Sequence, residues 1–259
     1  MLLAPLVALV VAVLAFAAGA LTVSGTVAAA VVGMLCLIAG WGWAALLIVY
    51  FVVAVTCSRV GADAKERRTS GVVAKAGRRD AVQVLANGGV FAAGAFLATH
   101  VAAGNGELLA AATVGALAAA SGDTLATEIG TLVGGEPRSV IGWRPVPAGT
   151  SGGITLAGSL GMLGGALLVA FAGRALGLGN SVLAAAAGGV AGALADSLLG
   201  AMVQERRHCP QCNLATERRL HDCGTATELA GGVAWLDNDL VNLCATLVGA
   251  AVAATVAVA

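Results

Sequence analysis

Charged residues are scarce in this sequence, at 11% of 259 residues, against roughly 25% in an average soluble domain. Hydrophobic residues make up 59%, and several stretches run roughly 17 residues without a charge, about the length needed to cross a bilayer. These two features exclude a soluble domain. The net charge is zero, so the basic surface typical of nucleic-acid-binding proteins is also missing. The start, Met-Leu-Leu-Ala-Pro, lacks the positive segment of a secretory signal, so we expect the first hydrophobic stretch to be retained.

The hydrophobic stretches predict an all-α fold, a polytopic transmembrane helical bundle of eight spans. We expect the spans at about 2–20, 22–40, 42–57, 81–103, 108–133, 152–173, 180–203 and 238–257. Three polar stretches separate the later spans, at 58–80, 134–151 and 204–237. Gly supplies 37 residues, which suits helices that pack closely through small side chains. We expect an N-terminal three-span unit over 1–57 and a five-span catalytic unit over 58–259.

The basic residues predict the orientation. Of the 14 Lys and Arg residues, all except Arg174 lie in the three polar stretches. Eight spans place those stretches on one side of the membrane. The positive-inside rule makes that side cytoplasmic and puts both termini outside.

Two of the predicted spans contain similar sequences. One has Gly-Ala-Leu-Ala-Ala-Ala-Ser-Gly-Asp123, the other has Gly-Ala-Leu-Ala-Asp196, and both are followed by a loop with Gly-Thr and Gly-Gly. Since both spans run in the same direction, the pattern is typical of a parallel internal repeat. Chance similarity between small-residue helices explains it equally well, so both interpretations stay open.

Three acidic residues, Asp123, Glu128 and Asp196, lie within predicted spans. A carboxylate at that depth costs at least a few kcal/mol, which makes such residues functional candidates. No Lys or Arg lies inside a span, so we expect no basic partner there. Asp123 and Asp196 are predicted on separate helices, at the floor of a cavity that opens to the cytoplasm. We expect them to bind one Mg²⁺ ion together, and the ion to bind a polyphosphate. The alternative is a protonated carboxyl bonded to a neighbouring helix.

The second polar stretch contains a candidate phosphate site. A Gly-, Thr- and Ser-rich turn that opens a helix offers backbone N–H groups and a positive dipole end. Such turns are common at helix starts, but two arginines and a membrane Asp lie close in sequence. The candidate nucleotide- and phosphate-binding residues are Arg138, Arg144, Gly149, Thr150, Ser151, Gly152 and Gly153.

Amides and acids gather at two further span entrances. Arg79, Gln83 and Asn87 share one face of the span that begins near 81. Asn238, Asp239 and Asn242 lie at the start of the last span. We expect both groups to bind substrate. The alternatives are interfacial anchoring by the arginines and helix capping by Asp237 or Asn238.

The third polar stretch holds His208-Cys-Pro-Gln-Cys212 and His221-Asp-Cys223. In a reducing compartment a Cys-Pro-x-Cys knuckle favours zinc over a disulfide. Cys209, Cys212, His221 and Cys223 would form a closed Cys₃His set. Free thiols are the alternative, because the His-x-Cys spacing is tighter than usual. Cys36, Cys57 and Cys244, in or beside spans, are interpreted as packing residues.

Several of these motifs together resemble one multi-pass membrane family, long of unknown function, that includes the plant phytyl-phosphate kinase of tocopherol synthesis. They are Gly-Asp123-Thr-Leu-Ala-Thr-Glu128-Ile-Gly130, Val-Pro-Ala-Gly-Thr150-Ser-Gly-Gly, Gln-Val-Leu-Ala-Asn87-Gly, Asp196-Ser-Leu-Leu-Gly200 and Trp-Leu-Asp-Asn238-Asp-Leu-Val-Asn242. The match covers roughly residues 20 to 255. More distantly, the Asp123 motif is similar to that of dolichol kinases, phytol kinases and CDP-diacylglycerol synthases, which use CTP with Mg²⁺. Their loop has a Lys before the Thr, where this chain has Ala148-Gly149, so Arg138 or Arg144 would supply that charge.

The resemblance implies a kinase that transfers a phosphoryl group from a nucleoside triphosphate, CTP by analogy, to an isoprenyl monophosphate. Its partners would be the nucleotide, the prenyl phosphate lipid and the bilayer. Asp123, Asp196 and Glu128 would be catalytic, with Mg²⁺ as cofactor and Zn²⁺ as a structural ion. The rival hypothesis is a transporter of small anions or lipid phosphates that uses the intramembrane carboxylates. The outer half has only Glu107 and Arg174 as charges, which favours the enzyme.

Overall fold

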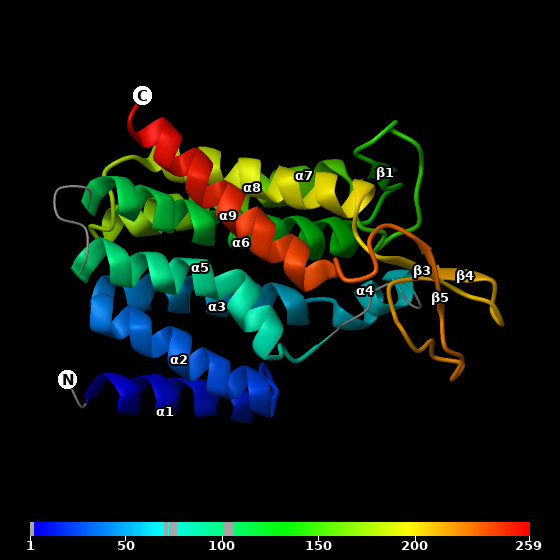
Figure 1. Cartoon of the computed structure of the whole chain (residues 1–259), viewed down its shortest axis with the longest axis horizontal. Helices are drawn as coiled ribbons and strands as arrows, with labels where there is room; N and C mark the ends of the chain where they lie inside the picture. The colour runs from blue at the N-terminus through cyan, green and yellow to red at the C-terminus, as the bar shows by residue number, and fades with distance from the viewer. Residues whose placement is uncertain (1–2, 70–71, 73–76, 101–105) are drawn as a thin grey trace.

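The computed structural model describes residues 3–69, 72, 77–100 and 106–259. Lys75, Met1 and Leu2, and the last residues of the span expected at 81–103 lie outside the described residues. Within the described ranges the chain forms nine helices. Figure 1 shows the longer helices running side by side along the long axis of the molecule and the shortest one at one end.

Eight of these helices lie where the hydrophobic stretches predict spans. They are α1 (Leu3–Ala17), α2 (Val23–Ala39), α3 (Trp41–Arg59), α5 (Ala81–His100), α6 (Gly106–Val133), α7 (Leu156–Ala175), α8 (Val182–Met202) and α9 (Asn238–Ala257). The remaining helix of the described chain, α4 (Ala62–Thr69), lies in the first polar stretch. Six of the eight are long and apolar enough to cross a membrane, whereas α1 and α2, with 15 and 17 residues, are shorter apolar helices. The protein is therefore multi-pass, and the number of eight spans remains a prediction.

Helix α6 occupies the centre of the bundle, against α3, α5, α7, α8 and α9. It is buried at most positions from Ala111 to Leu125. Glycines let its neighbours approach closely: a Cβ added to Gly161 of α7 would lie 2.6 Å from the Leu125 carbonyl oxygen. One added to Gly189 of α8 would lie 2.9 Å from the Ala118 Cβ. The helices thus touch backbone to backbone, as small-residue membrane helices do.

Contacts along α6 and α8 give the relative direction of these helices. A Cβ added to Gly189 would lie 2.9 Å from the Ala118 Cβ, and one turn further along both helices a Cβ added to Gly122 would lie 3.5 Å from the Ala193 Cβ. The residue numbers therefore rise together, and the two helices are parallel. This agrees with the direction that the predicted repeat requires. The duplication itself stays a prediction.

One hydrophobic cluster joins the two units expected at 1–57 and 58–259. Trp43 of α3 packs edge-to-face on Phe91 of α5, with ring centroids 5.8 Å apart. The same cluster includes Leu46 of α3, Leu117 of α6 and Val169 of α7. Helix α3 therefore packs as part of one continuous core with the later helices.

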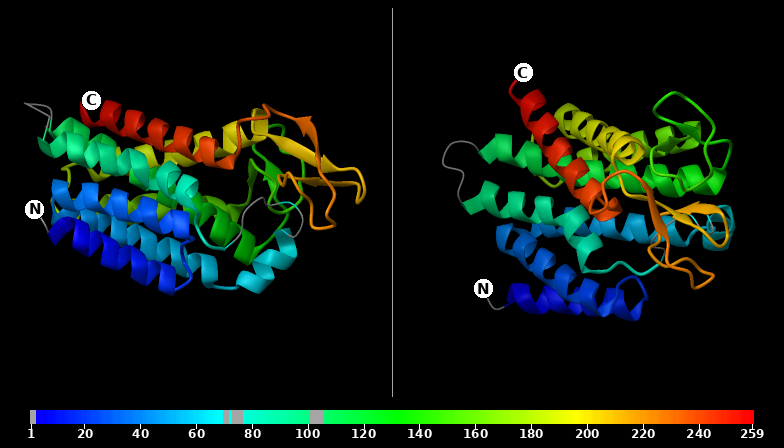
Figure 2. Two further views of the ribbon diagram at one scale, coloured as in Figure 1. Left: turned by 60° about the horizontal axis from the view of Figure 1, so that its bottom comes forward. Right: turned by 45° about the vertical axis from the view of Figure 1, so that its right-hand side comes forward.

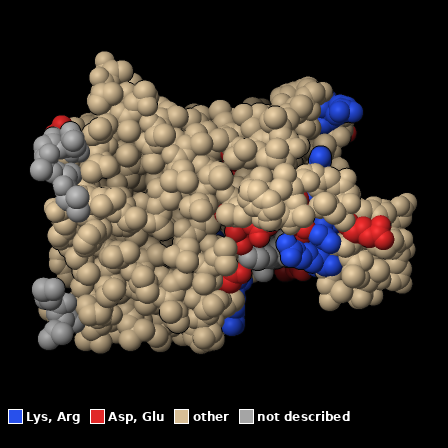
Figure 3. Space-filling view, viewed as in Figure 1, with Lys and Arg blue, Asp and Glu red and all other residues tan. Residues whose placement is uncertain are grey.

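The described parts of the three polar stretches gather at one end of the bundle, whereas α1 begins and α9 ends near the other end (Figures 1 and 2). Two small antiparallel sheets, which the sequence analysis did not anticipate, form at the polar end. One pairs β1 (Arg138–Ser139) with β2 (Gly153–Ile154), and the other has the order β4-β3-β5, from β3 (Arg206–Cys209), β4 (Leu214–Thr216) and β5 (Glu228–Gly231). Figure 3 shows charged side chains concentrated at this end and a nearly uncharged surface over the rest of this face.

Candidate functional site

A cavity of about 1450 Å³ opens at the polar end of the bundle. Its walls come from α3, α4, α5, α6, α7, α8, the start of α9 and the three polar stretches. In Figure 3 acidic and basic side chains surround a hollow in this region. Helices that are distant in sequence therefore meet around one polar space inside an apolar bundle.

Asp123 of α6 and Asp196 of α8 both line this cavity. Their carboxyl groups lie close enough to interact directly. The second oxygen of Asp196, Oδ2, is buried and has no protein partner. The structure therefore brings together the two acids that the sequence analysis placed on separate helices. Two facing carboxylates repel each other unless a proton or a cation lies between them.

Small residues make this approach of the two acids feasible. Gly122 precedes Asp123, and a Cβ added there would lie 3.4 Å from the Gly189 carbonyl oxygen of α8. One turn before Asp196, a Cβ on Gly192 would lie 2.6 Å from the Ala245 carbonyl oxygen of α9. The close packing of α6, α8 and α9 thus fixes both carboxylates at the floor of the cavity.

Glu128 has a basic partner, which corrects the expectation that none reaches the buried acids. Lys65 of α4, 8% exposed, forms an ion pair with Glu128. Its Nζ also donates to the carbonyl oxygens of Cys57 and Ser58, at 2.7 and 2.8 Å, and the Ser58 hydroxyl donates to Glu128 at 2.6 Å. Helix α4 folds back toward α6, so a residue of the polar stretch reaches into the bundle. Glu128 lines the cavity as a charge-compensated group.

The Gly-rich turn lines the cavity from Ala148 to Thr155. Gly149 and Gly152 have φ of 86° and 76°, a backbone conformation that favours glycine. A Cβ on Gly152 would lie 2.6 Å from the Ser197 carbonyl oxygen, so the turn rests on α8 beside Asp196. Helix α7 begins only at Leu156, later than the predicted start at 152, because the backbone first forms β2 and Thr155 then caps the helix.

Arg138 and Arg144, the predicted phosphate ligands, do not line the cavity. Arg138 donates to the Trp143 carbonyl oxygen at 3.0 Å, and Arg144 is exposed in the same turn. The β1–β2 pairing holds this turn outside the cavity lining. The arginines that do line it are Arg59, Arg68, Arg78, Arg79, Arg218 and Arg219.

The residues predicted at the two helix entrances all line the cavity. Gln83 forms a reciprocal cap with Asp80: its N–H donates to Asp80 Oδ1 at 3.0 Å, and its Oε1 accepts from the Asp80 N–H at 3.2 Å. The Asn87 side chain donates to the Gln83 carbonyl oxygen at 3.0 Å. These contacts hold Gln83 and Asn87 in place at the start of α5.

At the start of α9, Asp237 accepts from the Leu240 N–H at 3.1 Å, so it has the capping role given above as the alternative. Asp239 and Asn242 are 4% and 8% exposed and line the cavity together with Asn238. The entrance of α9 thus combines a cap with buried polar side chains that face the cavity.

Glu217 is a cavity residue that the sequence analysis missed. It accepts hydrogen bonds from the Ser151 hydroxyl and from the Gln204 amide, the latter at 3.1 Å. It lies near enough to Asp196 for the negative charges of the two carboxylates to repel each other. Glu217 therefore links the Gly-rich turn to the third polar stretch close to the acidic pair. Its sequence context, a loop Glu before two arginines, carries no local signal of this placement.

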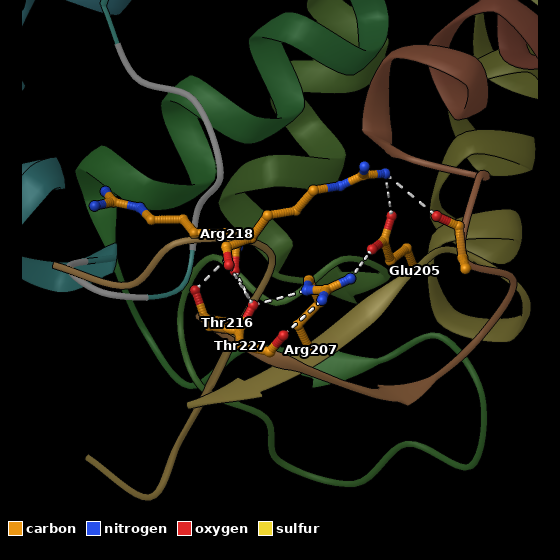
Figure 4. Close-up of polar contacts among 7 residues, drawn as sticks. Glu205, Arg207, Thr216, Arg218 and Thr227 are labelled. Atoms are coloured by element: carbon orange, nitrogen blue, oxygen red, sulfur yellow. Dashed lines mark hydrogen bonds and ion pairs between the residues drawn. The ribbon is translucent and has the colours of Figure 1, made fainter. Parts of the chain in front are cut away.

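Further contacts hold the third polar stretch together, as Figure 4 shows. Glu205, 4% exposed, pairs with Arg207 and, at 3.3 Å, with Arg219. Arg207 Nε donates to the Thr227 hydroxyl at 2.7 Å, and that hydroxyl donates to the Arg218 carbonyl oxygen at 2.6 Å. This network connects β3, the segment after β4, and the strand region near β5.

Cys209, Cys212, His221 and Cys223 come together at the tip of this stretch, as predicted. One ligand atom from each lies within 4.8 Å of all the others. Hydrogen bonds from Thr225 and His221 lower the pKa of the Cys223 thiol to about 6. The hydrogen bond with Cys223 raises the pKa of Cys212 to about 11. The four groups form the only such cluster of three or more potential metal ligands within the described ranges.

Comparison with known proteins places these observations in a family context. The model of the integral membrane protein family DUF92 matches residues 6–250. The chain is 30% identical over 251 residues to Protein PGR of Arabidopsis thaliana, covering 88% of this chain and 85% of that protein. It is 32% identical over 227 residues to the uncharacterized membrane protein MJ0933 of Methanocaldococcus jannaschii, covering 87% of this chain and 81% of that protein. No solved structure matches.

Proposed function

Because the chain belongs to the integral membrane protein family DUF92, we propose that it is a membrane phosphotransferase that converts an isoprenyl monophosphate to the diphosphate. The donor would be a nucleoside triphosphate, and the resemblance to CTP-dependent lipid kinases makes CTP the first candidate. One observation carries the proposal: a pair of facing carboxylates lies at the floor of an arginine-lined cavity beside a Gly-rich turn.

The acidic pair fits a divalent cation. The buried Oδ2 of Asp196 has no protein partner, and carboxylates together with phosphate oxygens are the usual ligands of Mg²⁺. Asp123 and Asp196 would hold the ion, which supplies charge neutralisation to the polyphosphate when it is bound. Glu128 has a different role, because its ion pair with Lys65 already compensates its charge.

The other cavity residues would bind and orient the two phosphates. Backbone N–H groups of residues 149–153 and the Thr150 hydroxyl would cradle the nucleotide. Arg79, Arg218 and Arg219 would neutralise phosphate oxygens, the role that the sequence predicted for Arg138 and Arg144. In the reaction an oxygen of the prenyl phosphate bonds to the γ-phosphorus, the bond from that phosphorus to the β–γ bridging oxygen breaks, and nucleoside diphosphate leaves.

The acceptor would be bound with its phosphate among Arg79, Gln83 and Asn87 and its prenyl chain among the apolar helices. The cavity also touches Gly19 and Ala20, in the turn after α1, so its polar wall adjoins the apolar N-terminal helices. The concentration of basic residues at this end supports a cytoplasmic active face.

The rival function, transport of anions or lipid phosphates, receives less support. Transporter sites are typically formed by discontinuous helices near the membrane midplane. Here α6 and α8, which carry the acidic pair, are continuous from Gly106 to Val133 and from Val182 to Met202.

The test is a phosphoryl-transfer assay on the purified protein. It uses γ-³²P-labelled CTP, ATP, GTP and UTP with Mg²⁺, and prenyl monophosphates of several chain lengths. We expect a labelled prenyl diphosphate that disappears in the Asp196→Asn variant and persists in Glu136→Gln, which alters an exposed acid outside the cavity. A folded protein that labels none of the acceptors with any nucleotide contradicts the proposal. Uptake of labelled phosphate or prenyl phosphate into liposomes would then support transport.

A further inference from the structure

We propose that Cys209, Cys212, His221 and Cys223 bind one Zn²⁺ ion, and that this ion clamps the segment carrying Glu217 and Arg219 against the cavity. The inference concerns the folding of the third polar stretch. It does not depend on the reaction proposed above.

Two distances within the cluster are close to those of a tetrahedral zinc site. With Zn–S near 2.3 Å and Zn–N near 2.0–2.1 Å, two sulfur ligands lie about 3.8 Å apart and a sulfur and a nitrogen about 3.6 Å. The Cys209 and Cys223 sulfurs are 3.6 Å apart, and His221 Nδ1 is 3.3 Å from the Cys223 sulfur. Four ligands complete a tetrahedral shell and leave no position for substrate, so the ion would be structural.

Both ligand pairs lie on tight turns that present their side chains to one point. Cys209 ends β3, and its carbonyl oxygen accepts from the Asn213 N–H at 2.9 Å, with Asn213 at φ 53°. The His221 carbonyl oxygen accepts from the Gly224 N–H at 2.8 Å, with Gly224 at φ 81°. The backbone thus preorganises a Cys-x-x-Cys knuckle and a His-x-Cys knuckle facing each other.

The clamped segment is the part of the stretch that reaches the cavity. Cys209 and Cys212 precede it, and His221 and Cys223 follow it. Between them, the Glu217 carboxylate accepts from Ser151 of the Gly-rich turn and the Glu217 N–H donates to the Val72 carbonyl oxygen at 2.8 Å. Arg219 contacts Glu205 at 3.3 Å. A metal that ties both ends of this segment therefore fixes two cavity side chains from outside the cavity.

Ordering this segment requires the ion because the stretch has little hydrophobic core. Leu214, Leu220 and Leu229 are 51%, 63% and 49% exposed. Small units with so little buried apolar surface are usually stabilised by metals or disulfides. Loss of the ion would leave the network of Figure 4 as the main constraint on the segment.

Metal analysis of the full-length protein, purified in detergent without chelators, tests the site. We expect about one zinc per chain, retained in His221→Cys, because a Cys₄ set also binds zinc. Cys212→Ser and His221→Ala should lose at least about half of the metal. Cys244→Ser, which alters a thiol of α9, is the matched control. Less than about a tenth of an equivalent of zinc in the unaltered protein overturns the proposal.

Hydrogen–deuterium exchange tests the clamp itself. In His221→Ala, and after chelation of the unaltered protein, we expect amides of residues 214–220 to exchange at least about tenfold faster. Amides of α6 and α8 should keep their protection, which shows that the bundle still folds. Zinc binding without this change in exchange would contradict the clamp. Hydrogen exchange is measured without phosphoryl transfer. The clamp can therefore fail while the proposed reaction stands, and the proposed reaction can fail while the clamp stands.

Discussion

Lys65 of α4 and Glu128 of α6 form an ion pair across 63 positions of sequence. Both side chains are mostly buried, 9% and 21% exposed. The pair joins the polar end of the bundle to its central helix. Glu128 differs in this from Asp123, which has no Lys or Arg partner among the described ion pairs.

This pair predicts the behaviour of single and double variants. Lys65→Met leaves Glu128 buried and uncompensated, so we expect it to lower the free energy of unfolding by roughly 3–5 kcal/mol. The double variant with Glu128→Gln should recover much of that loss. Thermal unfolding in detergent measures both. Asp63→Asn, on the exposed side of α4, is the control, and equal losses in the single and double variants would contradict the ion pair.

The acidic pair predicts non-additive loss of activity. Asp123→Asn and Asp196→Asn should each lower prenyl phosphate turnover at least about a hundredfold, because either change would remove a ligand of the proposed Mg²⁺ ion. The turnover of the double variant should be no lower than that of the less active single variant, because the two carboxylates would hold the same ion. Activity is measured across a Mg²⁺ titration. Independent, multiplying losses would show that the two acids have separate roles.

The Gly-rich turn predicts a difference between two glycines of similar backbone conformation. Gly152 and Gly177 have φ of 76° and 72°, but a Cβ would meet α8 only at Gly152. Both changes to Ala carry a left-handed penalty of about 1–2 kcal/mol. Gly152→Ala should lose about 1–3 kcal/mol more by overpacking and weaken nucleotide binding. Unfolding and equilibrium nucleotide binding measure these effects, and similar values for the two variants would mean that the turn does not rest on α8.

The basic residues predict the orientation in the membrane. Alkaline phosphatase fused after Ala259 should be active in a bacterial host, because that enzyme matures only outside the cytoplasm. Green fluorescent protein inserted after Glu136, in the second polar stretch, should fluoresce, because the inserted protein would lie in the cytoplasm, where it folds into its fluorescent form. The reverse pattern would place the polar end outside and remove access to cytoplasmic nucleotide.

Local features of the chain made the helices predictable. The length and apolar character of a stretch are properties of consecutive residues, so each of the eight predicted spans contains a helix. The boundaries were less accurate where turns intervene. The span expected from 152 begins at Leu156, because Gly153 and Ile154 pair with β1 before Thr155 caps the helix.

The site was predictable where chemistry dictates partners. Buried carboxylates need compensation, so Asp123 and Asp196 could be expected to meet, and Cys and His at knuckle spacing could be expected to cluster. The arginines were harder to place. Arg138 and Arg144 precede the Gly-rich turn in sequence, yet the β1–β2 pairing holds their turn away from the cavity, where Arg79 and Arg219 lie instead.

The sequence by itself determined a multi-pass helical membrane protein with its charges at one end, because hydrophobic length and charge position are encoded residue by residue. Only the tertiary structure decided that Lys65 neutralises Glu128 and that Glu217 joins the Gly-rich turn to the third polar stretch. Those contacts depend on how α4 folds back and how the stretch between α8 and α9 closes over the cavity. Long-range packing sets both, and no periodicity or spacing in the chain records it.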